Sequence, residues 1–212
     1  MTKQSFTFSL NYLKSCAICA ATEQTRYYLN GVAVQYDGKD LVAVATDGHR
    51  MVCFNIDFAK EGETIEPFSM IIPKAIIDGI KTDKTLNNVS LILATKDMKP
   101  YLQYGHNMFL FDPIDGIFPE WQRVIPSAFS NVPAQFNPKY LMDFAKITKL
   151  WTKGDRITVT PNGEGPCYVD LNIVDIQGFG ILMPLREKSS PATHAPLWAT
   201  GFRIPVNKDV AA

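Results

Sequence analysis

The stretch FSMIIPKAIIDGI, residues 68–80, joins a strand-like apolar run to a Pro-Lys pair and then to apolar residues at helical spacing. Proline fits the first turn of a helix because its missing N–H would have no partner there. The stretch VPAQFNPKYLMDFA, residues 132–145, repeats this order, with its Pro-Lys pair 65 residues later. Ser9 lies 64 residues before Pro73 and can cap a helix at the start of the chain. These three helix starts predict an internal repeat.

Strand-like runs follow each predicted helix. They are separated by Asp-Gly and Asn-Gly pairs, which tolerate positive φ and favour hairpins. The runs cover residues 27–36, 41–46 and 51–56, then 89–94, 100–104 and 108–111, then 156–160, 167–174 and 179–184. The sequence therefore predicts an α+β fold of antiparallel sheets, built from three β-α-β-β-β units with a period near 60 residues.

The composition is that of a soluble globular protein, with 46% hydrophobic and 20% charged residues in 212. There is no run of ~18 apolar residues that could span a membrane, and the N-terminal sequence is unlike a signal peptide. We therefore expect a cytoplasmic protein. The 21 basic and 21 acidic residues argue against a uniformly basic nucleic-acid coat, but they allow one basic face.

Lysines concentrate on the predicted helices, where acidic residues are few. The helical lysines are Lys14, Lys74, Lys81, Lys139 and Lys146, with Lys84 and Lys149 near helix ends. Such a pattern suits a face that contacts an anionic partner, and it suits an ordinary solvated helix face equally well.

Nothing in the sequence indicates an enzyme, a metal site or a cofactor. Cys16 and Cys19 form a C-x-x-C, but no second pair completes a metal site, so small buried cysteines on a helix are the better interpretation. The carboxylates Asp112 and Asp115 lie in DPIDG, which is typical of a loop. His49, His106 and His194 have no metal-ligand spacing.

Four motifs together resemble a known family. They are RYYLNGV (26–32), VATDGHRM (44–51), DGIFPEWQRVIP (115–126) and ILMPLR (181–186). They are similar, in the same order, to RYYLNG, VATDGHRL, DGRFPDYRRVLP and VVMPMR of the bacterial DNA polymerase III beta subunit, the sliding clamp. The resemblance covers about residues 5–187 and implies a DNA-clamp fold of β-α-β-β-β units.

The resemblance also implies a domain organisation. The bacterial clamp has three domains of two units each, whereas this chain has three units. Residues 1–126 resemble the whole middle domain, and residues 127–187 resemble the second half of the last domain. Residues 188–212 form a C-terminal tail with apolar residues that could cover the unpaired half, a neighbouring subunit or the groove, or could remain disordered. A shortened clamp fits a phage or mobile-element origin.

In the family, a hydrophobic groove binds short peptides of polymerases, clamp loaders and repair proteins. The resemblance assigns this groove to Leu29, Thr46, Gly48, His49, Arg50, Met51, Pro119, Val124, Ile181, Met183, Pro184, Leu185 and Arg186. An apolar wall of this kind binds apolar anchors, and methionine adapts to different partners. His49 and Arg50 are expected to donate hydrogen bonds at the rim.

The resemblance further implies that the helices line a central hole. Lys14, Lys74, Lys81, Lys139 and Lys146 would then contact the phosphates of double-stranded DNA without reading sequence. Family rings contain twelve units, so three per chain predict a tetramer. The alternative is a non-ring module that recruits or sequesters host replication proteins through the same groove.

Overall fold

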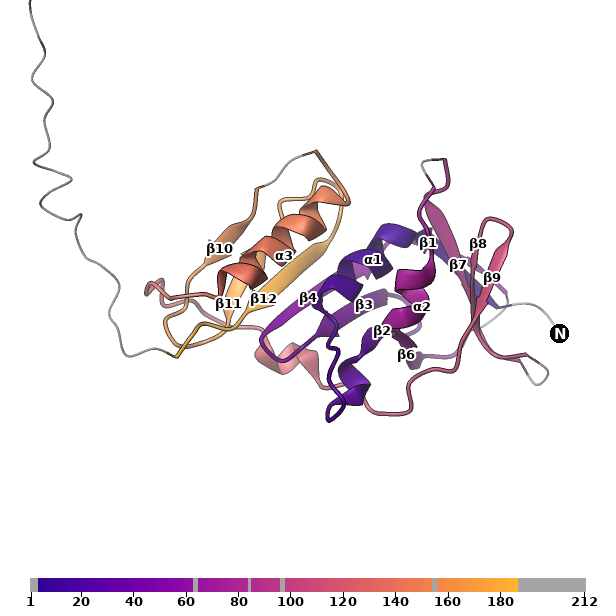
Figure 1. The fold of residues 1–212 in the computed structure, drawn as a ribbon, viewed down its shortest axis with the longest axis horizontal. Helices are drawn as coiled ribbons and strands as arrows, with labels where there is room; N and C mark the ends of the chain where they lie inside the picture. Colours follow the sequence, from indigo (N-terminus) through magenta and orange to yellow (C-terminus); the bar gives the residue numbers. More distant parts are fainter. Residues whose placement is uncertain (1–3, 63–64, 84, 96–97, 154–155, 187–212) are drawn as a thin grey trace, which may run out of the picture.

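The computed structural model of the protein describes residues 4–62, 65–83, 85–95, 98–153 and 156–186. The predicted tail, residues 188–212, and Lys84 lie outside the described residues. Within the described ranges, no helix is long and apolar enough to cross a membrane. Figure 1 shows α1, α2 and α3 on one side of the molecule, with sheets behind them.

Two complete units come first. The first unit is β1 (Ser5–Ser9), α1 (Leu10–Cys19), β2 (Gly31–Tyr36), β3 (Leu41–Thr46) and β4 (Arg50–Ile56). After the extra strand β5 (Phe58–Glu61), the second unit is β6 (Phe68–Pro73), α2 (Lys74–Gly79), β7 (Asn88–Ile92), β8 (Tyr101–Tyr104) and β9 (Asn107–Leu110). Short 3-10 helices cover Tyr27–Leu29 (η1) and Trp121–Val124 (η2), the first of which replaces the start of the predicted strand 27–36.

The third unit differs from the prediction. It contains α3 (Pro138–Lys149), β10 (Thr158–Thr160), β11 (Cys167–Asp170) and β12 (Gly178–Leu182), but residues 132–137 before α3 form no strand. In the first two units the strand before the helix joins the sheet of the other unit, since β1 pairs with β7 and β6 pairs with β2. The third unit has no second unit of this kind in the described chain, so its first strand has no sheet to join.

The strands form two antiparallel sheets. One has the order β5-β1-β7-β8-β9, and the other has the order β10-β11-β12-β4-β3-β2-β6. The larger sheet crosses from the first unit to the third through the β4–β12 ladder, in which Met51 faces Ile181. The division at residues 126 and 127 stays a prediction.

Capping side chains set the helix starts. The Ser9 side chain accepts a hydrogen bond from the Asn11 N–H, and the Asn137 side chain accepts one from the Lys139 N–H. Pro73 is the N-cap of α2. The three caps are 64 residues apart in each case, so the two Pro-Lys pairs, spaced by 65, are out of register by one residue.

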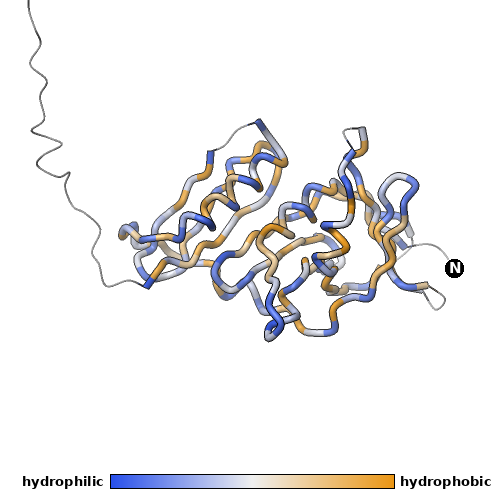
Figure 2. The backbone as a smooth tube through the Cα atoms, viewed as in Figure 1, coloured by the Kyte–Doolittle hydropathy of each residue, from blue (hydrophilic) through white to orange (hydrophobic). Residues whose placement is uncertain are grey.

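The core lies between the helices and the sheets. Figure 2 shows hydrophobic residues along the strands and at intervals along the helices. Phe6, Phe54 and Phe144 are fully buried, as are Leu13 and Ile77. α1 contacts both α2 and α3, so the three helices form one layer. This layer covers one face of the larger sheet, from the first two units to the third.

The cysteines are buried, as predicted for the pair on α1. Cys16, Cys19, Cys53 and Cys167 are free thiols, and burial raises the pKa of each, to about 12 for Cys19 and Cys53. Since the thiolate is the reactive form, we expect almost no thiol of the folded chain to react with Ellman's reagent at pH 8 within minutes. In denaturant all four should react. Rapid reaction of a native thiol would contradict this burial.

Candidate functional site

A cavity of about 230 Å³ lies where the first unit, η2 and the third unit meet. Ten of the predicted groove residues line it: Leu29, Thr46, Gly48, His49, Arg50, Met51, Pro119, Val124, Ile181 and Met183. The structure therefore gathers residues from all four sequence motifs around one concave surface. Leu29, Met51 and Ile181 belong to one buried apolar cluster that forms its floor.

The β4–β12 junction positions the two sides of the cavity. Ile181 faces Met51 across the ladder, and the Met183 N–H donates to the His49 carbonyl at 2.9 Å. The Asp47 carboxylate accepts hydrogen bonds from the His49 and Arg50 N–H groups at 2.9 Å, which fixes the hairpin turn before β4. Backbone pairing thus holds the rim residue His49 beside the end of β12.

Glycine is required at position 48 by the backbone conformation and by the close approach of a neighbouring side chain. Its φ is +88°, a conformation that L side chains rarely adopt. A Cβ at this position would lie 2.5 Å from Arg26 Nη1. The glycine therefore lets the Arg26 guanidinium lie directly against the turn, where the Glu23 carboxylate holds it at 2.9 Å.

Three predicted groove residues do not line the cavity: Pro184, Leu185 and Arg186. The Leu185 N–H instead donates to the Gln135 carbonyl at 2.8 Å. Conversely, Arg26, Tyr28, Glu120 and Trp121 line the cavity although the sequence analysis did not select them. All four lie inside the motifs RYYLNGV and DGIFPEWQRVIP, so the motifs contained the signal.

Trp121 also lines a second, larger cavity of about 700 Å³ on the sheet face opposite the helices. Its indole N–H donates to Gln35 Oε1 at 2.9 Å. Tyr168 and Phe179 stack with ring centroids 5.5 Å apart in this cavity. The smaller cavity contains the residues from the family motifs, so we take it as the candidate groove.

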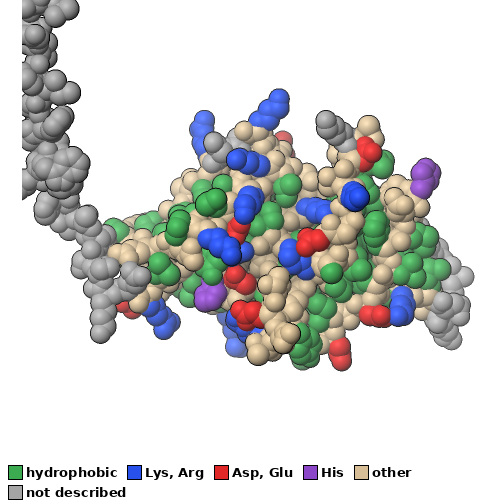
Figure 3. Space-filling model, in the orientation of Figure 1, with side chains coloured by type: hydrophobic (Ala, Val, Ile, Leu, Met, Phe, Trp, Pro, Cys, Tyr) green, Lys and Arg blue, Asp and Glu red, His purple; other side chains and the backbone are tan. Residues whose placement is uncertain are grey.

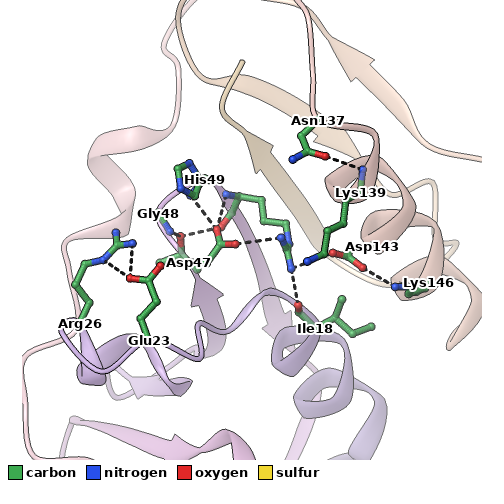
Figure 4. A network of polar contacts seen from close by, with 12 residues as sticks. Ile18, Glu23, Arg26, Asp47, Gly48, His49, Asn137, Lys139, Asp143 and Lys146 are labelled. Atoms are coloured by element: carbon green, nitrogen blue, oxygen red, sulfur yellow. Dashed lines mark hydrogen bonds and ion pairs between the residues drawn. The ribbon is translucent and has the colours of Figure 1, made fainter. Parts of the chain in front are cut away.

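Arg50 lines the groove, but its guanidinium is directed to the third unit. It forms ion pairs with Asp47 and Asp143 at 3.0 Å each, and it donates to the Ile18 carbonyl at 2.9 Å. Figure 4 shows Asp47 and Asp143 on the two sides of this network, with Lys146 beyond Asp143. Its expected role as a rim donor to a peptide does not fit this geometry, because these partners engage the two terminal nitrogens and the Nε atom, which has no partner, is buried.

Tyr140 of α3 connects the same network to the groove. The Arg50 guanidinium carbon lies 4.6 Å from the centroid of the Tyr140 ring, a cation–π contact. The His49 ring stacks on Tyr140 at 5.9 Å with planes 14° apart. His49 is therefore positioned from α3 as well as from its own hairpin, and it remains available at the groove rim.

The predicted DNA-facing lysines fall into two groups. Lys14 Nζ donates to the Ile77 carbonyl at 2.6 Å, and Lys74 Nζ donates to the Ala17 carbonyl at 2.7 Å. These bonds join α1 to α2 near their C-terminal ends, where carbonyls favour cations. Burial lowers the pKa of Lys14, although Asp78 opposes this shift.

The other three lysines are exposed. Lys146 forms an ion pair with Asp143 at 2.7 Å but keeps 60% of its side chain exposed. Among the described residues, Lys81 and Lys139 form no ion pair. Figure 3 shows Lys and Arg side chains spread over the helical face, with Asp and Glu among them. No group of three metal-ligating side chains occurs in the described ranges.

Comparisons with known proteins agree with the motifs. The family model of the central domain of the DNA polymerase III beta subunit matches residues 8–120. The chain is 30% identical to the beta sliding clamp of Vibrio cholerae over 68% of its own length and 39% of that protein. It is 31% identical to the beta sliding clamp of Escherichia coli over 50% of its own length and 28% of that protein.

Solved structures show the same fold. The DNA polymerase sliding clamp of Bacillus subtilis superposes with a TM-score of 0.69 at 16% identity, over 86% of this chain and 64% of that one. The sliding clamp of Pseudomonas aeruginosa gives a TM-score of 0.67 at 17% identity, over 86% of this chain and 66% of that one. The chain thus spans well under half of the curated relatives, yet it has the clamp fold and belongs to the DNA polymerase III beta subunit family, the bacterial sliding clamps.

Proposed function

We propose that this protein is a sliding clamp that encircles duplex DNA as an oligomer and tethers a polymerase and other factors through the groove around His49. The observation that carries the proposal is the gathering of ten predicted groove residues at one cavity between the first unit and the third. A similar clamp from Bartonella birtlesii has been solved bound to griselimycin, and one from H. pylori in complex with Diflunisal.

The groove has the chemistry of a peptide site. Its apolar floor of Leu29, Met51 and Ile181 suits an aliphatic or aromatic anchor. His49 supplies a polar group at the rim, and Val124, 40% exposed, lines the groove from η2. A short segment with one or two apolar anchors, such as those of polymerases and clamp loaders in this family, fits this arrangement.

The DNA proposal rests mainly on Lys81, Lys139 and Lys146, because Lys14 and Lys74 hold helices together. Contacts from flexible lysines to phosphates are independent of sequence and weaken with salt, as sliding requires. A ring also needs interfaces between copies. β4 and β12 are each the last strand of a unit, and they pair with each other. β9 is also the last strand of its unit, but it stands at the edge of its sheet and is open to a second copy.

Topological retention on DNA tests the proposal. Labelled protein would be dissociated by dilution, concentrated again with nicked circular plasmid, and separated from free protein by gel filtration in high salt. A ring is expected to stay on the circle and to leave when a restriction enzyme linearises it. Equal, salt-sensitive retention on both forms would indicate ordinary DNA binding. No retention on either form, with peptide binding intact, would favour the non-ring module.

A further inference from the structure

We propose that the third unit of one chain docks on the third unit of a second copy, and that the two together complete one full clamp domain around a two-fold axis. The surface involved is the open half, defined as residues 132–137, β10 and the exposed face of α3. This inference gives the proposed ring one of its interfaces and in that respect rests on the proposed function. Its evidence, however, is the repeat inside this chain.

The first two units show how a clamp domain is completed. β1 precedes α1 but pairs with β7 of the second unit, and β6 precedes α2 but pairs with β2 of the first. Each unit therefore gives its first strand to the other unit's sheet. A unit without a partner must have one strand with no sheet and one sheet with an open edge.

The third unit has both features. Residues 132–137 belong to neither sheet, and β10 is the terminal strand of the seven-stranded sheet. An open edge strand presents backbone groups that pair readily with another chain. In a second copy of the third unit, β10 offers an open edge to residues 132–137, and residues 132–137 offer a strand to β10. A two-fold, self-complementary interface therefore pairs both features at once.

Residues 132–137 already lie where β1 lies in the first unit. Thr7, two residues before the cap of α1, pairs with Ala59, three residues after β4 ends. Likewise the carbonyl of Gln135, two residues before the cap of α3, accepts the N–H of Leu185, three residues after β12 ends. One side of the segment is thus occupied as in β1, and the other side corresponds to the side on which β1 receives β7.

The backbone of the segment is suited to a new partner on that side. In an antiparallel strand, successive residues direct their N–H and C=O groups to opposite sides. Because Gln135 faces Leu185, Ala134 and Phe136 face the other way, and within the described residues their N–H groups make no hydrogen bond. Pro133, which has no N–H, faces the Leu185 side and does not obstruct pairing.

The repeat also predicts the register. Ala33 in β2 faces Ile71, which lies two residues before the cap of α2. Three residues before the end of β4, Cys53 faces Val44, which faces Ala33. Three residues before the end of β12, Phe179 faces Asp170, which faces Thr158. Thr158 in β10 therefore corresponds to Ala33 in β2. Thr158 of one copy is therefore expected to face Gln135 of the other.

The exposed face of α3 carries an apolar residue where the helices of a clamp domain meet. Lys14, the fifth residue of α1, donates to the Ile77 carbonyl of α2 at 2.6 Å. Met142 is the fifth residue of α3 and is 62% exposed. Val132, at the start of the segment, is 53% exposed. Burial of these side chains against a second copy would remove apolar surface from water.

Disulfide trapping between different chains tests the interface. A Gln135→Cys chain and a Thr158→Cys chain, each with its own tag, would be co-expressed and oxidised mildly. The predicted pair is a non-hydrogen-bonded one with Cα atoms about 4.5 Å apart, within reach of a disulfide. Random pairing puts the two variants together in half of the dimers, so we expect about half of the mixed sample to form a disulfide-linked dimer carrying both tags, and either chain alone to form almost none. The native thiols are buried and should not compete.

Two controls sharpen the result. Thr160→Cys, two residues along β10, should couple to Gln135→Cys several-fold more slowly, because diagonal neighbours are about 7–8 Å apart. Met142→Glu should halve the mass in light scattering, whereas Lys149→Glu at the end of α3 should leave it unchanged. Absence of cross-linked dimers from the mixed sample would overturn the inference and leave the groove and DNA proposals standing. Cross-linking without retention on circular DNA would retain the interface and remove the ring.

Discussion

Arg50→Met is expected to lower the free energy of unfolding by about 3–5 kcal/mol, because removing one member of a buried ion pair leaves the other charges uncompensated. Arg50 and Asp143 are 8% and 4% exposed, and Asp47 also pairs with the same guanidinium. The substitution would leave two carboxylates facing each other across the junction of β4 and α3. Urea denaturation followed by circular dichroism measures the effect.

Two companion variants separate charge from geometry. Arg50→Lys keeps the charge, but an ammonium cannot reproduce the fork that bonds Asp47, Asp143 and the Ile18 carbonyl, so an intermediate loss is expected. Lys99→Ala removes an exposed ion pair to Asp112 and should change stability by about 1 kcal/mol or less. If Arg50→Met and Lys99→Ala had equal effects, the buried network would not stabilise the junction.

The network explains why part of the site could not be predicted from sequence. The motif VATDGHRM identified His49 and Arg50 as neighbours, but His49 lies in the turn before β4 and Arg50 is the first residue of that strand. His49 reaches the groove rim, whereas the Arg50 guanidinium reaches Asp143, which lies 93 residues further along the chain. No local pattern indicates that contact.

The fold could be predicted from the sequence more completely than the site, because local sequence signals determine the helices and strands. The strand boundaries of β3 and β8 follow apolar alternation and turn residues closely, and the caps mark all three helices. The missing strand before α3 was not predictable from VPAQFN itself, since a strand requires a partner as well as a propensity. The same reasoning applies to Lys14 and Lys74, whose carbonyl partners appear only when α1 packs against α2.

Val124→Asp is expected to weaken peptide binding by about 30-fold or more, or about 2 kcal/mol at 1.4 kcal/mol per tenfold. Val124 lines the groove from η2, and a carboxylate there would lose water when an apolar anchor enters. The side chain is 40% exposed, so the substitution should leave folding intact. Fluorescence anisotropy of a labelled peptide with a Gln-Leu-x-Leu-Phe-like sequence measures the affinity.

Val174→Asp is the matched control for that experiment. It makes the same chemical change at a position that is 82% exposed and does not line the groove, so it should bind the peptide as the wild type does. Equal weakening by both variants would point to nonspecific repulsion between the peptide and an added charge. Loss confined to Val124→Asp would locate binding at this groove, which Trp121 and Met183 also line. No loss in either variant would remove the groove from the proposed function.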